Sequence, residues 1–375
     1  MNVIIFGCSH HNTLGVIRSL GEKGIPTILI LVEDKGYSFV GKSKYLKEVL
    51  FVHDENEGIR IIQNWCITGF YGMVISTSDG VSAKLDEYYD SIISNFSIFN
   101  IAQVQGRINN FMNKQEQSCY AITHSLNVPN SVILKYDTIL SCQLNYPVIT
   151  KPIKSILGKK TDILICYNKK QLEKVLSIHP LEEFQVQEFI EKDFEYQLIG
   201  CSFDAGNEIV IPCVSKIIRC PQNTNTGYLK IIPICEFSID MNTVRYFIRD
   251  LGYSGLFSLE FIRDKSGIDY FMELNMRNDG NAYAVTGAGV NLPYLWYLYH
   301  TNRELFKIEN KIVKKSVTAM PELSDFKFVL KRKVSLFSWI KDYNGAKVLL
   351  LYNTNDKTPF YYYFIYRFIS LLRRK

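Results

Sequence analysis

The sequence of 375 residues predicts an α/β protein with α+β parts, in which a parallel sheet comes first and antiparallel strands follow. Two observations carry this prediction. Up to about residue 105, short apolar strands alternate with helices, which is typical of a parallel sheet. From about residue 186, strands follow one another through short polar turns, which favours antiparallel pairing. The length is enough for two or three domains, each with its own core.

The N-terminal part opens with a strand–helix–strand unit. Residues 2–7 and 25–34 predict buried strands on either side of a helix that ends at Gly24, and the strand–helix pattern then recurs. Functional loops of such sheets follow the carboxyl ends of the strands. Residues 7–12 and 76–80 are therefore candidates to face a ligand.

The first of these loops, GCSHHNTLG, does not favour a dinucleotide site. Gly7 and Gly15 are too far apart to make the tight phosphate turn of G-x-G-x-x-G. His10 and His11 lie between them. The pair is compatible with contact to a substrate and also with plain polar surface, and the sequence leaves both interpretations open.

Turn and capping residues predict the helices and strands after about residue 105. A helix capped by Asn113 is predicted to stop before NVP, and the strand YPVITKP ends at Lys151 and a proline. A hairpin is expected to turn at residues 204–207, and two further strands to meet at residues 264–267. Residues 278–280 then form a turn that opens a helix.

Composition excludes several classes of function. The net charge of +6 comes mostly from the C-terminal tail, so the body gives no case for nucleic-acid binding. Nine cysteines without a C-x-x-C pair favour reduced thiols in the cytoplasm and argue against a zinc site. The chain begins without the pattern of a secretory signal, and no run approaches the roughly 20 apolar residues of a membrane span.

Polar and apolar side chains alternate in YFMELNMRNDG, residues 270–280. Residues two apart in a strand point the same way, so Glu273, Asn275 and Arg277 share one face. Glu260, in the preceding strand, stands beside Glu273 if the two strands form a hairpin. Two like charges repel unless a cation lies between them, and with the Asn275 oxygen they suit Mg²⁺. The sequence therefore predicts a metal site beside an anion held by Arg277.

Two lysines add to this arrangement. Lys114, near the start of its helix, and Lys151, at the end of its strand, are candidates to neutralise phosphate charge. Taken singly, each of these residues is better explained as a solvated side chain. Their order along the chain favours a common site.

That order resembles the ATP-grasp superfamily, the ATP-dependent carboxylate–amine ligases and their relatives. The resemblance covers roughly residues 1–300 and rests on FMNKQEQSCYAITHSLNVPNS, YPVITKP, FQVQEFIEKDFEY and LEFIRD…YFMELNMRNDG. It implies a Rossmann-like domain at residues 1–105, a lid at 106–185 and an antiparallel ATP-grasp part with the metal site at 186–305. Residues 306–375 would be a C-terminal extension.

The resemblance also implies site residues. Contacts with ATP would come from Lys114, Lys151, Lys159, from the hinge residues Gln187, Glu188, Phe189 and Ile190, and from Glu195 at the ribose. Magnesium or manganese would be held by Glu260, Glu273 and Asn275, with Glu273 bridging if two ions bind. The terminal phosphate, an acyl phosphate or the substrate carboxylate would meet Arg277, Lys216 and Arg219.

The implied activity is ligation: ATP phosphorylates a carboxylate, and an amine displaces the phosphate. This agrees with the residues, because phosphoryl transfer needs positioning and charge neutralisation more than a protein nucleophile. No biotin-linked domain is found, which favours an amide or peptide-like bond over carboxylation. The layout is most like the D-aspartate-ligase-like and polysaccharide-associated members.

Rival functions remain open. Many members have several glycines in the loop after the Lys-Pro strand, whereas SILGKKTD has only Gly158, with Lys159 and Lys160 beside it. Because of this departure, a non-catalytic ATP-binding regulatory protein of the same fold is an alternative function. A carboxylation enzyme, or one that stops at phosphoryl transfer, is the other alternative.

The C-terminal residues 326–375 are rich in aromatic residues and end in basic ones. The run from Phe360 to Leu372 is too short to span a bilayer. It could lie at a membrane surface, with Arg373, Arg374 and Lys375 toward anionic lipid, or pack on the body or on a second subunit of a homodimer. Packing is the favoured alternative.

Overall fold

The computed structural model describes residues 1–33, 37–137, 143–152, 163–178, 183–220 and 226–372, apart from the side chains of Pro152 and residues 367–372. The chain divides into two compact units. Unit 1 comprises Met1–Ile108, Gln197–Ser258 and Asn275–Lys375, and unit 2 comprises Asn109–Tyr196 and Leu259–Leu274. The expected four-part division of the chain stays a prediction.

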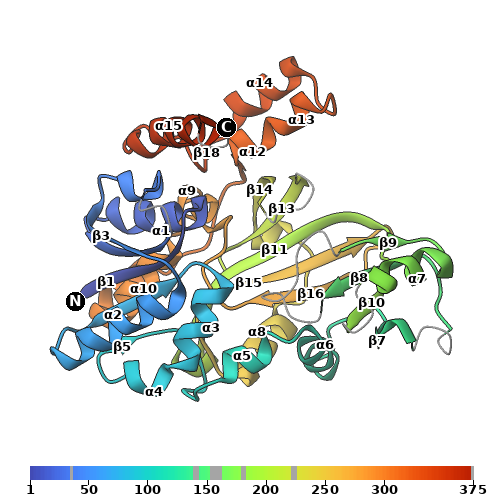
Figure 1. Cartoon of the computed structure of the whole chain (residues 1–375), viewed down its shortest axis with the longest axis horizontal. Helices are drawn as coiled ribbons and strands as arrows, with labels where there is room; N and C mark the ends of the chain where they lie inside the picture. Colours follow the sequence, from blue (N-terminus) through green and yellow to red (C-terminus); the bar gives the residue numbers. More distant parts are fainter. Residues whose placement is uncertain (34–36, 138–142, 153–162, 179–182, 221–225, 373–375) are drawn as a thin grey trace. The chain divides into compact units, whose positions relative to one another are not determined.

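The first sheet, in unit 1, has five parallel strands in the order β3-β2-β1-β4-β5 (Figure 1). These are β1 (Asn2–Cys8), β2 (Thr27–Val32), β3 (Leu46–Val52), β4 (Gly72–Ser76) and β5 (Phe96–Ser97). The helices that alternate with them are α1 (His11–Gly21), η1 (Val40–Lys42), α2 (Glu55–Ile67), α3 (Asp79–Glu87) and α4 (Tyr89–Ile92). The parallel α/β opening predicted from the sequence is confirmed.

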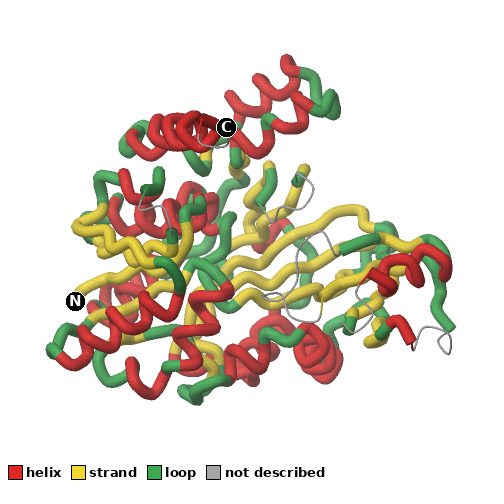
Figure 2. Tube along the Cα trace, viewed as in Figure 1, coloured by secondary structure: helices red, strands yellow, loops and turns green. Residues whose placement is uncertain are grey.

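Continuous apolar runs explain the layers of this sheet. Ile4 and Phe6 of β1 pack with Ile59 and Ile62 of α2 in one core cluster. The residues between them, such as Ile5, are equally buried, so the opposite face is covered as well. Figure 2 shows these strands between helical segments.

Helix α1 packs closely against α9 (Ala282–Gly287), also in unit 1. A Cβ at Gly15 would lie 3.0 Å from Cβ of Tyr283, and Ser19 Oγ is 2.9 Å from Thr286 Oγ1. Gly15 therefore permits a close helix crossing, which is a different use from a phosphate turn.

Unit 2 contains a four-stranded antiparallel sheet in the order β7-β10-β8-β9. Its core joins Val148 and Phe184 of the sheet to Leu172 and Leu176 of a helix. On another helix of the unit, the Gln117 side chain bonds both backbone groups of Leu274, at 2.8 and 3.1 Å. The elements are α6 (Lys114–Thr123), β7 (Ser131–Leu134), β8 (Val148–Pro152), β9 (Ile165–Cys166), α7 (Lys169–Ile178) and β10 (Phe184–Glu188), after α5 (Arg107–Phe111) at the border of the units.

The third sheet runs in the order β16-β15-β11-β13-β14-β17-β18, with β12 on β11 and β6 on β15. The hairpin predicted at 204–207 and the turn predicted at 264–267 are both present. The strands are β6 (Asn100–Ile101), β11 (Lys192–Phe203), β12 (Glu208–Val210), β13 (Cys213–Arg219), β14 (Tyr228–Pro233), β15 (Tyr253–Asp264), β16 (Asp269–Asn275), β17 (Val317–Met320) and β18 (Val348–Leu349). Shorter segments between them are η4 (Asp204–Gly206), η5 (Ile234–Glu236) and α8 (Met241–Leu251).

The C-terminal helices belong to unit 1, where α12 to α15 lie together in red (Figure 1). Helix α15 packs on the segment around η1, with ring centroids 5.3 Å apart for Phe39 and Tyr363 and 4.9 Å apart for Tyr37 and Tyr366. Its contacts support packing of the tail on the body. The helices are α10 (Leu292–Thr301), α11 (Arg303–Glu309), α12 (Glu322–Asp325), α13 (Lys327–Leu330), α14 (Leu336–Gly345) and α15 (Thr358–Leu372).

A buried ion pair joins the C-terminal segment to α1. Arg18 Nε is 3.1 Å from Asp356 Oδ2, and both side chains are fully buried. Arg18 also donates to the carbonyl oxygens of Leu351 and Asp356, and Ser43 donates to the Asp356 carboxylate. Among the described residues, no helix has the length and apolarity needed to cross a membrane.

Asp356→Asn should destabilise unit 1 by about 3 kcal/mol, because it leaves the Arg18 charge buried without its counter-ion. Chemical denaturation followed by the fluorescence of the tryptophans measures the loss. The matched control is Lys307→Met, which breaks the exposed pair with Glu304 and should cost less than about 1 kcal/mol. Equal losses in the two variants would contradict the prediction.

Candidate functional site

Lys151 is at the centre of the site expected in unit 2. It lies in β8, and its ammonium donates to Oε1 of Gln187 on β10 at 2.6 Å. Burial lowers the pKa of Lys151 to about 8, and the nearby positive charge of Lys114 acts in the same direction. The side chain is therefore held in place by a buried amide, and part of its population is neutral near pH 8.

Three carboxylates act on the same ammonium. The negative charges of Glu273, Glu260 and Glu195 each raise the pKa of Lys151, against the effect of burial. They come from β16, β15 and β11 respectively, and all three belong to unit 2. Because the interaction between two charges weakens with distance, these contributions indicate that unit 2 places these predicted charged residues near one another.

The donor set of this cluster fits magnesium. Glu260 and Glu273 are half-buried, and no group of three His, Cys, Asp or Glu side chains that could hold a metal occurs in the part of the chain that the structure describes. Magnesium usually takes only one or two carboxylates from the protein and completes its shell with phosphates and water. Two glutamates beside two lysines therefore suit a metal bound together with a polyphosphate.

Asn275 and Arg277 lie in unit 1 and point the same way, as the alternation predicts. Arg277 Nη2 donates to Asn275 Oδ1 at 3.1 Å, and Arg277 Nε donates to Oδ1 of Asp79 at 2.7 Å. Asp279 lies 3.7 Å from the same guanidinium. The charge of Arg277 is shared with two aspartates.

A buried polar network surrounds this arginine in unit 1. Asn12 Nδ2 donates to the carbonyl oxygens of Thr77 and Asn278, at 2.8 and 2.7 Å. Ser258 donates to Asp279 at 2.9 Å. These bonds join the ends of β1, β4 and β16, where the sequence predicted ligand-facing loops. Sequence reasoning named the loops that contain Asn12 and Asp79 but not these side chains, and their positions just after strands were a usable signal.

The histidine loop belongs to the same part of unit 1. His11 Nε2 lies 3.0 Å from Thr226 Oγ1, and its pKa is well below the ordinary value because of burial and then of the charge of His10. A Cβ at Gly280 would lie 2.6 Å from Thr226 Oγ1, so this position needs glycine for the close approach. His11 is thus a neutral, partnered side chain rather than plain polar surface.

Arg219 forms ion pairs with two aspartates. Its guanidinium is bidentate to Asp325, at 2.9 and 2.7 Å, and also bonds Asp342 at 2.5 Å, and its expected place near a phosphate or substrate carboxylate stays a prediction. It also lies over the Tyr228 ring, 4.6 Å from the centroid. Both aspartates are in the C-terminal extension, so this arginine anchors that extension. Lys216 is half-buried in β13 opposite Lys230.

The expected hinge, residues 187–190, lies in unit 2. Two of its backbone amides already bond backbone carbonyl oxygens of neighbouring segments. The amide of Glu188 donates to Asn130 O at 2.8 Å, and the amide of Phe189 donates to Pro147 O at 3.2 Å. Nearby, Glu195 accepts from Lys192 at 2.5 Å.

Lys159 and the rest of the lysine-rich loop lie outside the described residues.

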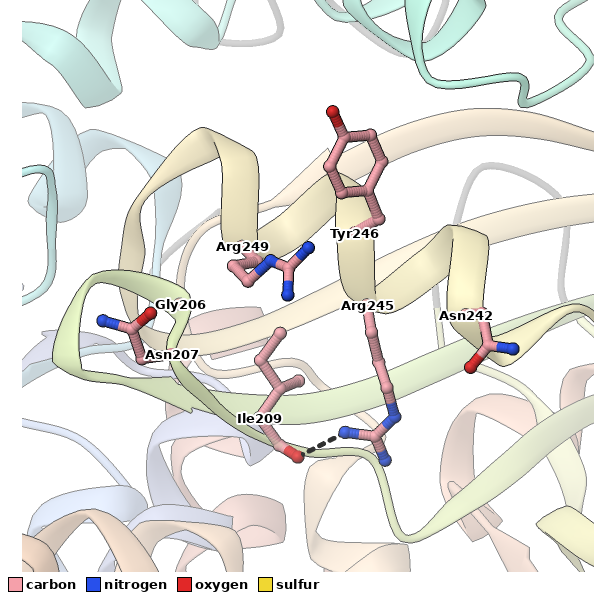
Figure 3. Close-up of a pocket in the computed structure, with 7 residues that line it drawn as sticks. All are labelled: Gly206, Asn207, Ile209, Asn242, Arg245, Tyr246 and Arg249. Carbon is pink, nitrogen blue, oxygen red and sulfur yellow. Dashed lines mark hydrogen bonds between the residues drawn. The ribbon is translucent and has the colours of Figure 1, made fainter.

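A hollow of about 510 Å³ in unit 1 is separate from this constellation. Figure 3 shows its lining from η4, β12 and α8, with Arg245 donating to Ile209 O at 2.7 Å. None of the predicted site residues is among the lining residues, which are Gly206, Asn207, Ile209, Asn242, Arg245, Tyr246 and Arg249. The hollow is therefore not part of the candidate site.

No family model matches the sequence, and no curated protein matches it. Solved structures do. The L-amino acid ligase from Bacillus licheniformis matches with a TM-score of 0.61 at 15% identity, covering 85% of this chain and 79% of the ligase. N5-Carboxyaminoimidazole synthetase from Staphylococcus aureus matches with a TM-score of 0.64 at 13% identity, covering 88% and 85%. The chain has the ATP-grasp fold.

A third ATP-grasp structure is the biotin carboxylase–β,γ-ATP complex from Campylobacter jejuni. Its TM-score is 0.63 at 14% identity, covering 79% of this chain and 70% of the carboxylase. The Staphylococcus aureus synthetase has also been solved with ADP. Identities this low establish the fold, and the ATP-grasp fold is the one expected from the order of the motifs.

Two substitutions should move the pKa of Lys151 in opposite directions. Lys114→Met removes a nearby positive charge and should raise that pKa, whereas Glu273→Gln removes a negative charge and should lower it. Side-chain NMR titration of the metal-free protein measures the pKa. Lys265→Met, an exposed change in the same unit, is the control and should leave it unaltered. Shifts in one common direction would refute the convergence of these groups.

Proposed function

We propose that this protein is a Mg²⁺-dependent ligase that uses ATP to activate a carboxylate and joins it to an amine. The observation that carries the proposal is the convergence of Lys114 and three glutamates on Lys151 in unit 2. This set supplies positive charge for phosphates and carboxylate oxygens for a metal, on a fold found in enzymes of this class.

In the proposed reaction, an oxygen of the substrate carboxylate attacks the γ-phosphorus of ATP, and ADP leaves. The amine then attacks the acyl carbon, phosphate leaves, and the nitrogen loses a proton. Neither step needs a protein nucleophile, because positioning and charge neutralisation carry the catalysis. Lys151 and Lys114 bind the phosphates, and Glu195 is assigned to the ribose hydroxyls.

Glu260 and Glu273 would hold magnesium or manganese, with the Asn275 oxygen as a further donor. The metal supplies neutralisation of the phosphate charge. For Arg277 we assign two tasks. It orients the Asn275 amide through Nη2, and it is assigned to contact the transferring phosphoryl group.

The bond formed is proposed to be an amide or peptide-like bond. The solved relatives include an L-amino acid ligase and also carboxylases, so the fold admits both reactions. Amino acids are therefore the first carboxylates and amines to test.

A cytoplasmic location is proposed as well, because all the cysteines of the described chain are free thiols. A homodimer stays a prediction.

The test is ADP release measured with ATP, Mg²⁺ and a panel of amino acids and hydroxy acids, with and without amines. Glu273→Gln should lower the substrate-stimulated rate by about 100-fold, because it removes a charge that holds the metal. Glu304→Gln, an exposed change in unit 1, is the control and should leave the rate unchanged.

The panel separates the rival functions. ADP release that no acid stimulates indicates a non-catalytic ATP-binding protein. Release stimulated by an acid without an amide product indicates an enzyme that stops at phosphoryl transfer, and dependence on bicarbonate indicates carboxylation. An undiminished rate in Glu273→Gln refutes the metal assignment.

A further inference from the structure

The hairpin of helices α13 and α14 exposes large apolar side chains. Phe337 is 83% exposed and Leu330 is 72% exposed, and Leu336 and Ile340 are also exposed. The turn between the helices includes Arg332, whose φ of 55° is in the left-handed region. Figure 1 shows this turn at the end of the helix pair away from β18. Residues 326–341 are called the apex below.

The apex carries positive charge only. Its basic residues are Lys327, Lys331, Arg332, Lys333 and Lys341, and it contains neither aspartate nor glutamate. All five basic residues are exposed. A patch that mixes exposed apolar side chains with uncompensated positive charge is unusual for free protein surface.

The acidic residues that border the apex are turned inward. Asp325 and Asp342 both bind Arg219, and Trp339 Nε1 donates to Asp325 at 3.0 Å. The inner side of the hairpin is aromatic, with the Trp339 ring 5.2 Å from that of Tyr343. Because this side is held by ion pairs and ring contacts, the apolar and basic side chains of α14 are left to face outward.

We propose that the apex binds a membrane surface rich in anionic lipid. Lipid phosphate groups complement the basic residues, and the acyl region accepts Phe337 and its apolar neighbours. An anionic lipid surface can bind the basic residues and the exposed apolar side chains of the apex at the same time. The proposal is independent of the ligase function, since it uses no residue of the nucleotide site.

The experiment is co-sedimentation of the full chain with vesicles of phosphatidylcholine alone and with about one third phosphatidylserine. Binding is expected only with the anionic lipid and should weaken as salt rises. The triple variant Lys331→Glu/Arg332→Glu/Lys333→Glu should bind about 100-fold more weakly, since each base near such a surface contributes substantially. Phe337→Ser should bind about tenfold more weakly.

Two controls match these changes. Lys47→Glu/Arg60→Glu/Lys170→Glu alters net charge equally at dispersed exposed positions, and Ile67→Ser removes an apolar side chain that is also 83% exposed. Both should bind like the unaltered chain, and far-ultraviolet circular dichroism checks that every variant is folded.

Several results would overturn the lipid proposal. These are absence of binding to the anionic vesicles, equal binding to neutral ones, and losses in the dispersed-charge control as large as in the apex variant. Retention on an acidic polypeptide without vesicle binding would indicate a protein partner instead.

Discussion

The candidate site depends on the charges that surround the amino group of Lys151, which is partly neutral. Moving Lys151 away from water favours its neutral form, and the carboxylates of Glu260 and Glu273 oppose that effect. Burial and the charge of Lys114 both lower the pKa of Lys151, whereas the glutamates raise it. A polyphosphate and a divalent cation entering together would satisfy both signs at once, since the anion meets the lysines and the cation meets the glutamates.

Three arginines organise the rest of unit 1, and each pairs with aspartate across a long stretch of chain. Arg18 reaches Asp356, Arg219 reaches Asp325 and Asp342, and Arg277 reaches Asp79. A guanidinium offers several donors in a rigid plane, so one arginine can hold two segments in a fixed orientation. The first two pairs attach the C-terminal extension, and the third joins the loop after β4 to the end of β16.

Sequence patterns predicted much of the fold because they rest on local physics. The apolar strands of the first sheet are buried on both faces, and the turns near residues 204–207 and 264–267 carry polar and glycine residues. Strand β3 escaped prediction because Lys47 and Glu48 interrupt its apolar run, as suits an edge strand. Its solvated side leaves only a weak alternation to detect.

The site was predictable only in part, for a related reason. Alternation places Asn275 and Arg277 on one face, but nothing local reveals that Asp79 shares the charge of that arginine. The same holds for Arg219, whose partners lie more than a hundred residues away. Residue type therefore predicts what a side chain can bind, while its actual partner depends on contacts that only the folded chain creates.

This distinction also explains how the ATP-grasp fold persists at about 12–15% identity. The sheets require apolar side chains at alternate positions, a demand that Val, Ile, Leu and Phe meet almost equally well. The proposed site needs charges at a few strand and helix positions, such as Lys114, Lys151 and Glu273. Because buried positions accept several apolar residues, the same fold can form at low sequence identity. Arg219 stabilises the C-terminal segment of this chain through Asp325 and Asp342.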